Sequence, residues 1–465
     1  MGGFTRLCER GGMKRRFGLI LAVLLAAALR GEVPSAIAIQ GAHVVAVHGP
    51  ELAHGTVLIR NGLIEAVGEN VPVPGDAWVI NGAGLTVYPG FIDALGTWGI
   101  PAPAPPAPGR AAGAGGTPPA TAQPEPRVRG PEDRPQTYAY ERAADLVSPS
   151  DSRLEAARAA GFTTSATFPN RGIIEGLGAL VDLAGERGRD MVVAQPIGEQ
   201  IIFRVGGGGF GRSFPASLMG NIAYVRQLYL DEANYREARQ IYAKNPAGNR
   251  RPEYDHALEG LSEAPRILLP AQESQQIDRI LRFGRELKVP FVVYGAHEGY
   301  RSIDELKQAN VPVLVSLKWP EKPKNADPAD IPNERDLEMR ERAPEVPGLL
   351  AKSGIAFGFY SDGIESAPDL KKALKKAVDA GLTRPDAIKA LTWNTAEIYG
   401  AADRLGSIEK GKIANLTVTR GEAFDDKSTV EYVIIDGKLF EPSKELQKPA
   451  PPTGPQGKPA EGEVN

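Results

Sequence analysis

The chain is poor in the two side chains that most often build disulfides and zinc sites. It has one cysteine, Cys8, and five histidines in 465 residues. A lone cysteine excludes an internal disulfide, and its place near the N-terminus leaves no thiol nucleophile or thiolate ligand further on. Three histidines lie before residue 60, so only His256 and His297 remain for the long middle of the chain.

An excess of positive charge is also absent. The chain carries 54 Lys and Arg against 57 Asp and Glu, a formal charge of -3. Such a balance gives no general basic surface, and we expect no nucleic acid partner. The composition, 42% hydrophobic and 24% charged, is typical of a soluble globular protein. The length allows one large barrel with an appended layer, or two to three units of roughly 150 residues.

The N-terminal segment 1–28 contains a basic cluster followed by a short apolar run and three alanines. Residues 13–28 read MKRRFGLILAVLLAAA. This is the pattern of a secretory signal, with Met13 as a possible true start, and it is too short for a confident membrane span. A buried N-terminal helix is the alternative. We therefore expect export to the periplasm or beyond, with no stable membrane span after cleavage.

Two β-rich segments lie some 300 residues apart. Residues 37–87 hold alternating apolar strands, with Asn61-Gly62 between TVLIR and LIEAVG. Residues 401–441 repeat the pattern, with Asp436-Gly437 as the turn. Both dipeptides are strong hairpin signals because the central residues need positive φ. Each segment alone is too short to bury a face, so we expect them to pack as one small β-sandwich.

Between these segments, residues 88–400 alternate helical patterns with short apolar strands. Residues 275–288 precede PFVVYG, for example, and Ser366 and Gly381 bracket a helix as cap and stop. Repeated alternation predicts a parallel sheet in an α/β fold. We prefer a distorted (β/α)8 TIM-type barrel to an open doubly wound sheet, because no strand-linked dinucleotide fingerprint is present.

Two stretches interrupt this pattern. Residues 101–135 are rich in Pro, Ala and Gly and predict a loop insertion, and residues 442–465 predict a disordered tail. A glycine cluster, RVGGGGFGR, runs from Arg204 to Arg212. No clean strand-to-helix context surrounds it, so we interpret it as a lid over the barrel mouth rather than a phosphate loop. Its two arginines remain candidate contacts for an anionic ligand.

Several motifs in order resemble the amidohydrolase superfamily of metal-dependent hydrolases. They are VLIRNGLIEAVG, GLTVYPGFIDA, YSDG, ALTWNTAEIYGAADRLGSIEKGKIANLTV and VIIDGKLF, and they span roughly residues 37–440. The resemblance implies a distorted barrel with a split β-sandwich. It also implies hydrolysis, often of C–N bonds, by water bound to one or two divalent metals held by four histidines and an aspartate at the strand ends.

The residues at the places of the family's histidines do not bind metals. Leu95 and Thr97 follow GFIDA, where the family has a His-x-His pair, and Pro270 and Gly295 fall at the next two expected positions. Asp362 of YSDG is the one match. Two histidines in the barrel cannot rebuild a four-histidine centre. We expect no metal cofactor, with a single zinc ion as the alternative.

The remaining candidates follow predicted strands. Asp362, His297 and Glu298 are the candidate catalytic residues, as an acid–base group or a weak mononuclear site, and Tyr300 is a candidate ligand contact. The alternatives are an ordinary Ser-Asp-Gly turn around Asp362 and a loop in which His297 and Glu298 bond the backbone or solvent. Asp93 of GFIDA is predicted to be structural.

These observations leave three classes of function open. The first is a noncatalytic relative that binds a small-molecule ligand, or that assembles as a homo-oligomer or with an active homologue. The second is an exported C–N hydrolase with an atypical mononuclear or metal-free site. The third is a structural or interaction protein.

Overall fold

The computed structural model describes residues 36–101, 134–203, 215, 217–322, 331 and 333–449. The predicted signal segment, Arg204 and Arg212 lie outside the described residues. So do most of the Pro-rich insertion and most of the predicted tail. Among the helices described, none is both long and apolar enough for a membrane span.

The two β-rich segments form one hydrogen-bonded sheet. Its order is β18-β17-β16-β5-β1-β2-β3, with β4 paired to β1, so the N- and C-terminal segments join where β5 and β16 run antiparallel. Edge strand β3 also bridges back at Leu63 to Ile413. The sheet thus encloses a core drawn from both segments. The strands are β1 (Ala36–Val44), β2 (Leu52–Arg60), β3 (Leu63–Gly68), β4 (Ala77–Asn81), β5 (Leu85–Pro89), β16 (Leu416–Arg420), β17 (Thr429–Ile435) and β18 (Lys438–Phe440).

Both predicted hairpin turns are present. Asn61 and Gly62 have φ of 52° and 79°, and Asp436 and Gly437 have φ of 49° and 72°. The two turns also touch, because a Cβ added at Gly437 would lie 2.7 Å from the Cα of Gly62. Glycine is therefore required at this contact for space as well as for its backbone conformation.

The middle of the chain forms two further sheets, of order β10-β9-β7-β6 and β15-β14-β13-β12-β11-β8. Strands β11 to β15 run parallel to one another, as do β6 and β7. Strand β8 is antiparallel to β11, and β9 is antiparallel to both β7 and β10. Strand β15 contacts β6. The strands are β6 (Phe91–Gly96), β7 (Phe162–Thr167), β8 (Ile174–Leu177), β9 (Ala179–Asp182), β10 (Val192–Ala194), β11 (Glu199–Ile201), β12 (Ile267–Ala271), β13 (Phe291–Gly295), β14 (Val313–Ser316) and β15 (Phe357–Tyr360).

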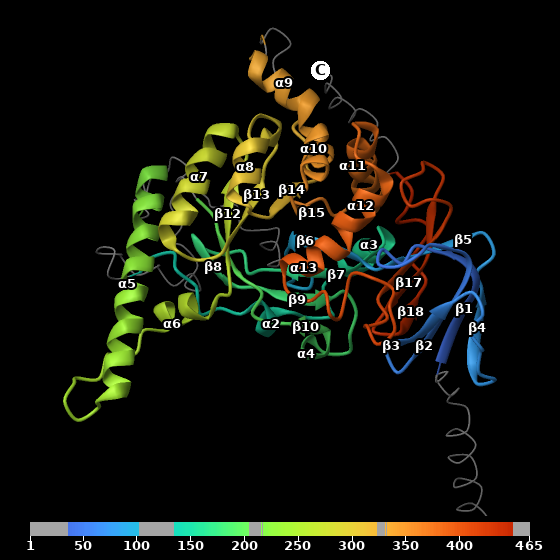
Figure 1. Ribbon diagram of the computed structural model, residues 1–465, viewed down its shortest axis with the longest axis horizontal. Coiled ribbons are helices and arrows are strands. Elements are labelled where there is room, and N and C mark those ends of the chain that lie inside the picture. Colours follow the sequence, from blue (N-terminus) through green and yellow to red (C-terminus); the bar gives the residue numbers. More distant parts are fainter. Residues whose placement is uncertain are drawn as a thin grey trace, which may run out of the picture.

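Helices cover these sheets from outside, and the β-rich sheet stands at one end of the molecule (Figure 1). The predicted helix after Ser366 ends before Gly381, which has φ of 108°, although Ser366 makes no side-chain cap bond. The helices are α2 (Ala143–Leu146), α3 (Leu154–Ala159), α4 (Gly188–Met191), α5 (Leu218–Lys244), α6 (His256–Glu263), α7 (Ser274–Leu287), α8 (Ile303–Ala309), α9 (Glu334–Arg342), α10 (Val346–Ser353), α11 (Ala367–Asp379), α12 (Arg384–Leu391) and α13 (Trp393–Ile398), with short 3-10 turns η2 (Gly299–Arg301) and η3 (Ala343–Glu345).

Successive strand residues divide between two apolar clusters. Ile267, Val293 and Val313 pack with the helices. Leu268, Val292 and Leu314 instead pack with strand β6 and with Tyr360 of β15. Because neighbouring side chains of a strand point to opposite faces, the second cluster is the interior that the strands enclose.

Candidate functional site

Three polar residues meet where strands β13, β14 and β15 end. The Oγ of Ser316 donates a hydrogen bond of 2.7 Å to Oδ2 of Asp362. The Nε2 of His297 lies 3.3 Å from the carbonyl oxygen of Ser316. The structure therefore brings together two of the predicted site residues through a serine that the sequence reasoning did not single out. A polar residue closing the apolar strand VPVLVS was the available signal.

His297 is suited to act as a neutral imidazole. Burial lowers its pKa, and the bond to Ser316 and the charge of Asp362 oppose that effect without reversing it. Because Nε2 faces a carbonyl oxygen, it carries the proton in the neutral ring. The lone pair is then on Nδ1.

Glu298 is committed to a different contact. Its carboxylate accepts bonds of 2.7 and 2.6 Å from Nε and Nη2 of Arg335, and one of 2.9 Å from the backbone N–H of Ser274 at the start of α7. The Arg335 bonds lower the pKa of Glu298 to about 2, against the opposing effect of burial. A carboxylate so held stays ionised at neutral pH and is a poor general acid.

Two further candidates lie in structural contacts. The ring of Tyr300 is buried, and the guanidinium of Arg342 lies 4.3 Å from its centroid. Asp93 is fully buried in β6 and accepts bonds from the backbone N–H of Ser361 at 3.0 Å and from Nε1 of Trp98 at 2.6 Å. Burial raises the pKa of Asp93 to about 6, although the Ser361 bonds oppose the shift. Asp93 thus ties β6 to the end of β15.

The places of the expected histidines are filled by other contacts. Leu95 is buried in the barrel interior. Thr97 accepts bonds from Arg153 at its Oγ1, 3.1 Å, and at its carbonyl oxygen, 2.9 Å. Pro270 pairs with Tyr294 in the register of β12 and β13. None of these three side chains offers an imidazole, and Leu95 and Pro270 offer no donor atom.

Gly295 has its space taken by a neighbour. It has φ of 106°, and a Cβ there would lie 2.8 to 3.0 Å from the amide group of Gln272. Nearby, the hydroxyl of Tyr294 donates a 2.8 Å bond to the carbonyl oxygen of Ile201. The end of β13 is thus occupied by an amide and a phenol.

The residues present do not fit a catalytic zinc centre. Such centres take three protein ligands, whereas His297 and Asp362 provide two. Within the described ranges, no three His, Cys, Asp or Glu side chains are grouped so that they could hold a metal ion.

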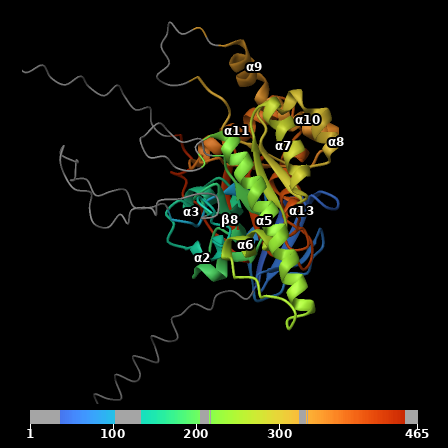
Figure 2. The same cartoon turned by 90° about the vertical axis from the view of Figure 1, so that its left-hand side faces the viewer.

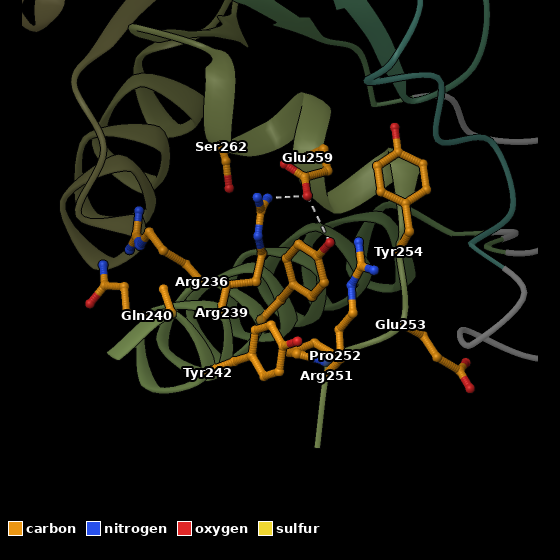
Figure 3. Close-up of a pocket in the computed structure, with 12 residues that line it drawn as sticks. Arg236, Arg239, Gln240, Tyr242, Arg251, Pro252, Glu253, Tyr254, Glu259 and Ser262 are labelled. Atoms are coloured by element: carbon orange, nitrogen blue, oxygen red, sulfur yellow. Dashed lines mark hydrogen bonds and ion pairs between the residues drawn. The ribbon is translucent and has the colours of Figure 1, made fainter. Parts of the chain in front are cut away.

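A cavity of about 810 Å³ lies elsewhere, between α5, α6 and the loop that joins them. The side chains of Arg239 and Tyr235 both donate hydrogen bonds to Glu259. Figure 3 shows Arg239 directed at Glu259, with Tyr242, Tyr254 and Arg251 nearby. None of the predicted site residues that the structure describes lines this cavity. It is therefore separate from the strand ends.

Known proteins resemble this chain in part of its sequence and in its fold. Residues 272–440 match the family model described as "Amidohydrolase family". The crystal structure of an amidohydrolase from Thermotoga maritima has 25% sequence identity and a TM-score of 0.68, and the match covers 87% of this chain and all of that chain. In its fold and over residues 272–440, this chain is similar to members of the amidohydrolase superfamily. The predicted fold class is thereby confirmed.

Two other known proteins are similar to this chain, one in fold and one over a short stretch of sequence. The crystal structure of a Xaa-Pro dipeptidase with bound methionine has 16% identity and a TM-score of 0.52, over 88% of this chain and all of that one. The adenine deaminase of Moorella thermoacetica is 30% identical over 80 residues. That stretch is 17% of this chain and spans 13% of the deaminase, so it aligns only a small part of that protein.

Proposed function

We propose that this amidohydrolase-family chain is a noncatalytic binding protein, whose barrel binds a small ligand at the strand ends or associates with an active relative. The observation that carries this proposal is the set of side chains at the strand ends. Metal-activated water is the family's route to hydrolysis, and Leu95, Thr97, Pro270 and Gly295 supply none of the imidazoles that it needs.

A ligand site in this place rests on three side chains. Asp362 is partly exposed, while His297 and Ser316 are buried beside it. A carboxylate acceptor next to a neutral imidazole suits a ligand with an N–H or O–H donor. Amides and ureides of the kind that active relatives hydrolyse have such donors, and we propose that class as the ligand.

A second candidate is hydrolysis by the same residues without the family's metal pair. The lowered pKa of His297 favours it, because a neutral imidazole can accept a proton from water. This second candidate has the same fold and the same site residues as the noncatalytic binding protein, and the two differ only in whether the bound ligand is hydrolysed.

Turnover and binding assays on the full chain separate these candidates. We would incubate hydantoin, N-acetyl amino acids and dipeptides with the wild type, His297→Gln and Asp362→Asn, and measure product. The noncatalytic proposal predicts no product above buffer for any protein, and a rise in Tm of the wild type with at least one compound that Asp362→Asn abolishes. Turnover lost in both variants, but kept in the control Glu253→Gln, would establish the hydrolase instead.

A further inference from the structure

The cavity between α5 and α6 is a hollow on the helical layer outside the barrel. Helix α5 lies across the side that faces the viewer in Figure 2, with the short helix α6 beside it. The cavity, of about 810 Å³, lies where the C-terminal half of α5, the loop that follows it and α6 meet. That volume is within the range of sites that bind small organic ligands. The cavity is therefore large enough for a ring system with a polar substituent.

Hydrogen bonds hold the walls of this cavity in place. The hydroxyl of Tyr235 on α5 donates a 2.7 Å hydrogen bond to Oε1 of Glu259 on α6. The guanidinium of Arg134 also joins the two helices, with bonds of 2.9 Å to Asp231 of α5 and 2.7 Å to Asp255, the N-cap of α6. Walls that are already fixed need little ordering when a ligand binds, so less of the binding free energy is lost.

One guanidinium in the lining is available to a ligand. Of the three arginines that line the cavity, Arg239 bonds to Glu259, and Arg236 lies 3.3 Å from Glu232. The third, Arg251, is exposed and has no hydrogen-bond or ion-pair partner among the residues that the structure describes. A guanidinium binds a carboxylate through two parallel hydrogen bonds. The lining therefore favours a ligand with one negative charge.

Aromatic side chains accompany this arginine. Figure 3 shows Arg251 between Tyr242 of α5 and Tyr254 of the loop, whereas Glu253 is directed away from them. Glu253 lies 3.7 Å from Arg250, which is not among the residues that line the cavity. Tyr254 is 76% exposed, so its ring is open to contact with a ligand. Aromatic rings pair favourably in offset or edge-to-face geometry, and a ligand with a ring of its own suits these walls.

We infer that this cavity is a second ligand site and that its ligand is a small aromatic carboxylate. Arg251 binds the carboxylate, and the ring packs against Tyr242 and Tyr254. A doubly charged anion such as phosphate fits less well, because one guanidinium is unpaired and the carboxylate of Glu259 lies in the same lining. The site is separate from the strand ends, so the inference holds whether or not the proposed function is correct.

The affinity is expected to be weak. Arg251 and Tyr254 are both exposed, so water and salt ions compete for the guanidinium and the ring. We expect a dissociation constant on the order of 0.1 mM at low ionic strength. The dissociation constant should rise as salt is added, because salt screens the contact between carboxylate and guanidinium.

Calorimetric titration of the full chain tests the site, with 2-naphthoate as the probe. Two partial probes each lack one feature: 2-naphthylmethanol has the ring without the charge, and cyclohexanecarboxylate has the charge without the aromatic ring. The wild type is expected to bind 2-naphthoate more tightly than either, by about 10-fold for the uncharged probe and about 3-fold for the non-aromatic one. Absence of 2-naphthoate binding at millimolar concentration, or equal binding of the three probes, would overturn the inference.

Variants of the full chain locate the bound probe. Arg251→Gln should weaken 2-naphthoate binding by about 10-fold or more, because the charged partner is lost, and Tyr254→Ala should weaken it about 3-fold. Arg250→Gln is the matched control, since it neutralises the adjacent arginine outside the lining, and it should bind as the wild type does. Asp362→Asn, at the strand ends, should also bind normally.

Two results would contradict this location. An affinity that Arg251→Gln leaves unchanged would show that the carboxylate is not bound in the cavity. Loss of binding in Asp362→Asn would place the probe at the strand ends instead. Far-ultraviolet circular dichroism of each variant verifies that the helices are intact.

Discussion

Two regions of this barrel treat polar side chains in opposite ways. In the core, where β6 and β15 meet and where the barrel meets the β-rich sheet, the buried carboxylates of Asp93 and Asp182 accept hydrogen bonds. At the strand ends, where relatives bind metals, the expected ligands are replaced by Leu95, Pro270 and the amide of Gln272. The contrast shows that the groups that hold this fold together are separate from those that would hold a metal.

A second hydrogen-bond network of this kind, around Asn415, also lies in the core. The Nδ2 of Asn415, just before β16, donates hydrogen bonds of 2.6 Å to Oδ1 of Asp182 in β9 and of 3.0 Å to Oγ1 of Thr164 in β7. Its Oδ1 accepts 2.8 Å from the backbone N–H of Asp436. One amide thus joins the β-rich sheet to two barrel strands. A lone carboxylate inside the apolar strand GALVD was the available signal.

The largest expected effect comes from removing Asp93. Asp93→Ala leaves the backbone N–H of Ser361 and the indole N–H of Trp98 buried without their acceptor, and we expect a loss of about 3 kcal/mol or more in the free energy of unfolding. Urea unfolding would measure it. The matched change at the strand ends, Asp362→Ala, removes one bond to Ser316 and should cost about 1 kcal/mol. Equal losses would erase the distinction between the two regions.

The next largest effect concerns Glu199, a fully buried carboxyl of β11. Burial raises its pKa to about 8, and the bond from Tyr229 of α5 only partly opposes the shift. Between pH 4.5 and 8 the folded chain therefore keeps a proton that the unfolded chain has lost, so stability falls as the pH rises through this interval. Glu199→Gln should remove this decline and gain about 1 to 3 kcal/mol at pH 8.

Urea unfolding at a series of pH values tests this prediction. Burial likewise raises the pKa of Asp93 to about 6 and of Asp182 to about 7. Glu199→Gln should therefore reduce the slope throughout the interval from pH 4.5 to 8, and the stability profile should become flat only above about pH 7. The exposed control Glu69→Gln should follow the wild type. An unchanged slope in Glu199→Gln would refute the assignment.

A smaller effect is expected at the Glu298 ion pair. The pKa of Glu298 is lowered, so its contribution is present above the ordinary pKa near 4.5 and is lost as the pH falls towards 2. Arg335→Gln should move the midpoint of acid unfolding to higher pH. The exposed control Arg250→Gln should leave it in place. If Arg335→Gln does not move the midpoint, the ion pair with Arg335 does not stabilise the fold, and Glu298 would again be a candidate catalytic acid.

The sequence predicted the strands and turns well because their signals are local. The apolar runs that became β12 to β15, and the two glycine turns, depend on neighbouring residues. Helix α5 was missed although its signals were present: Ser217 caps it, and no proline interrupts it.

The site was harder to predict because its contacts are distant in the chain. Glu298 was grouped with His297 as its sequence neighbour, but its partner Arg335 lies 37 residues away. His297 and Asp362 meet through Ser316, which no spacing rule connects to either. The absence of histidine at four expected positions could be predicted from the sequence, because a residue's identity is known without a structure. These residues are Leu95, Thr97, Pro270 and Gly295.

Measuring the metal content of the purified chain decides whether its strand ends have lost the family's metal site. The full chain would be purified without chelators, dialysed against zinc and analysed by plasma mass spectrometry, with Asp362→Asn in parallel. Because Leu95, Thr97, Pro270 and Gly295 supply no imidazole, we expect well below one zinc per chain and no difference between the two proteins. One or two zinc ions per wild-type chain that Asp362→Asn loses would contradict this expectation.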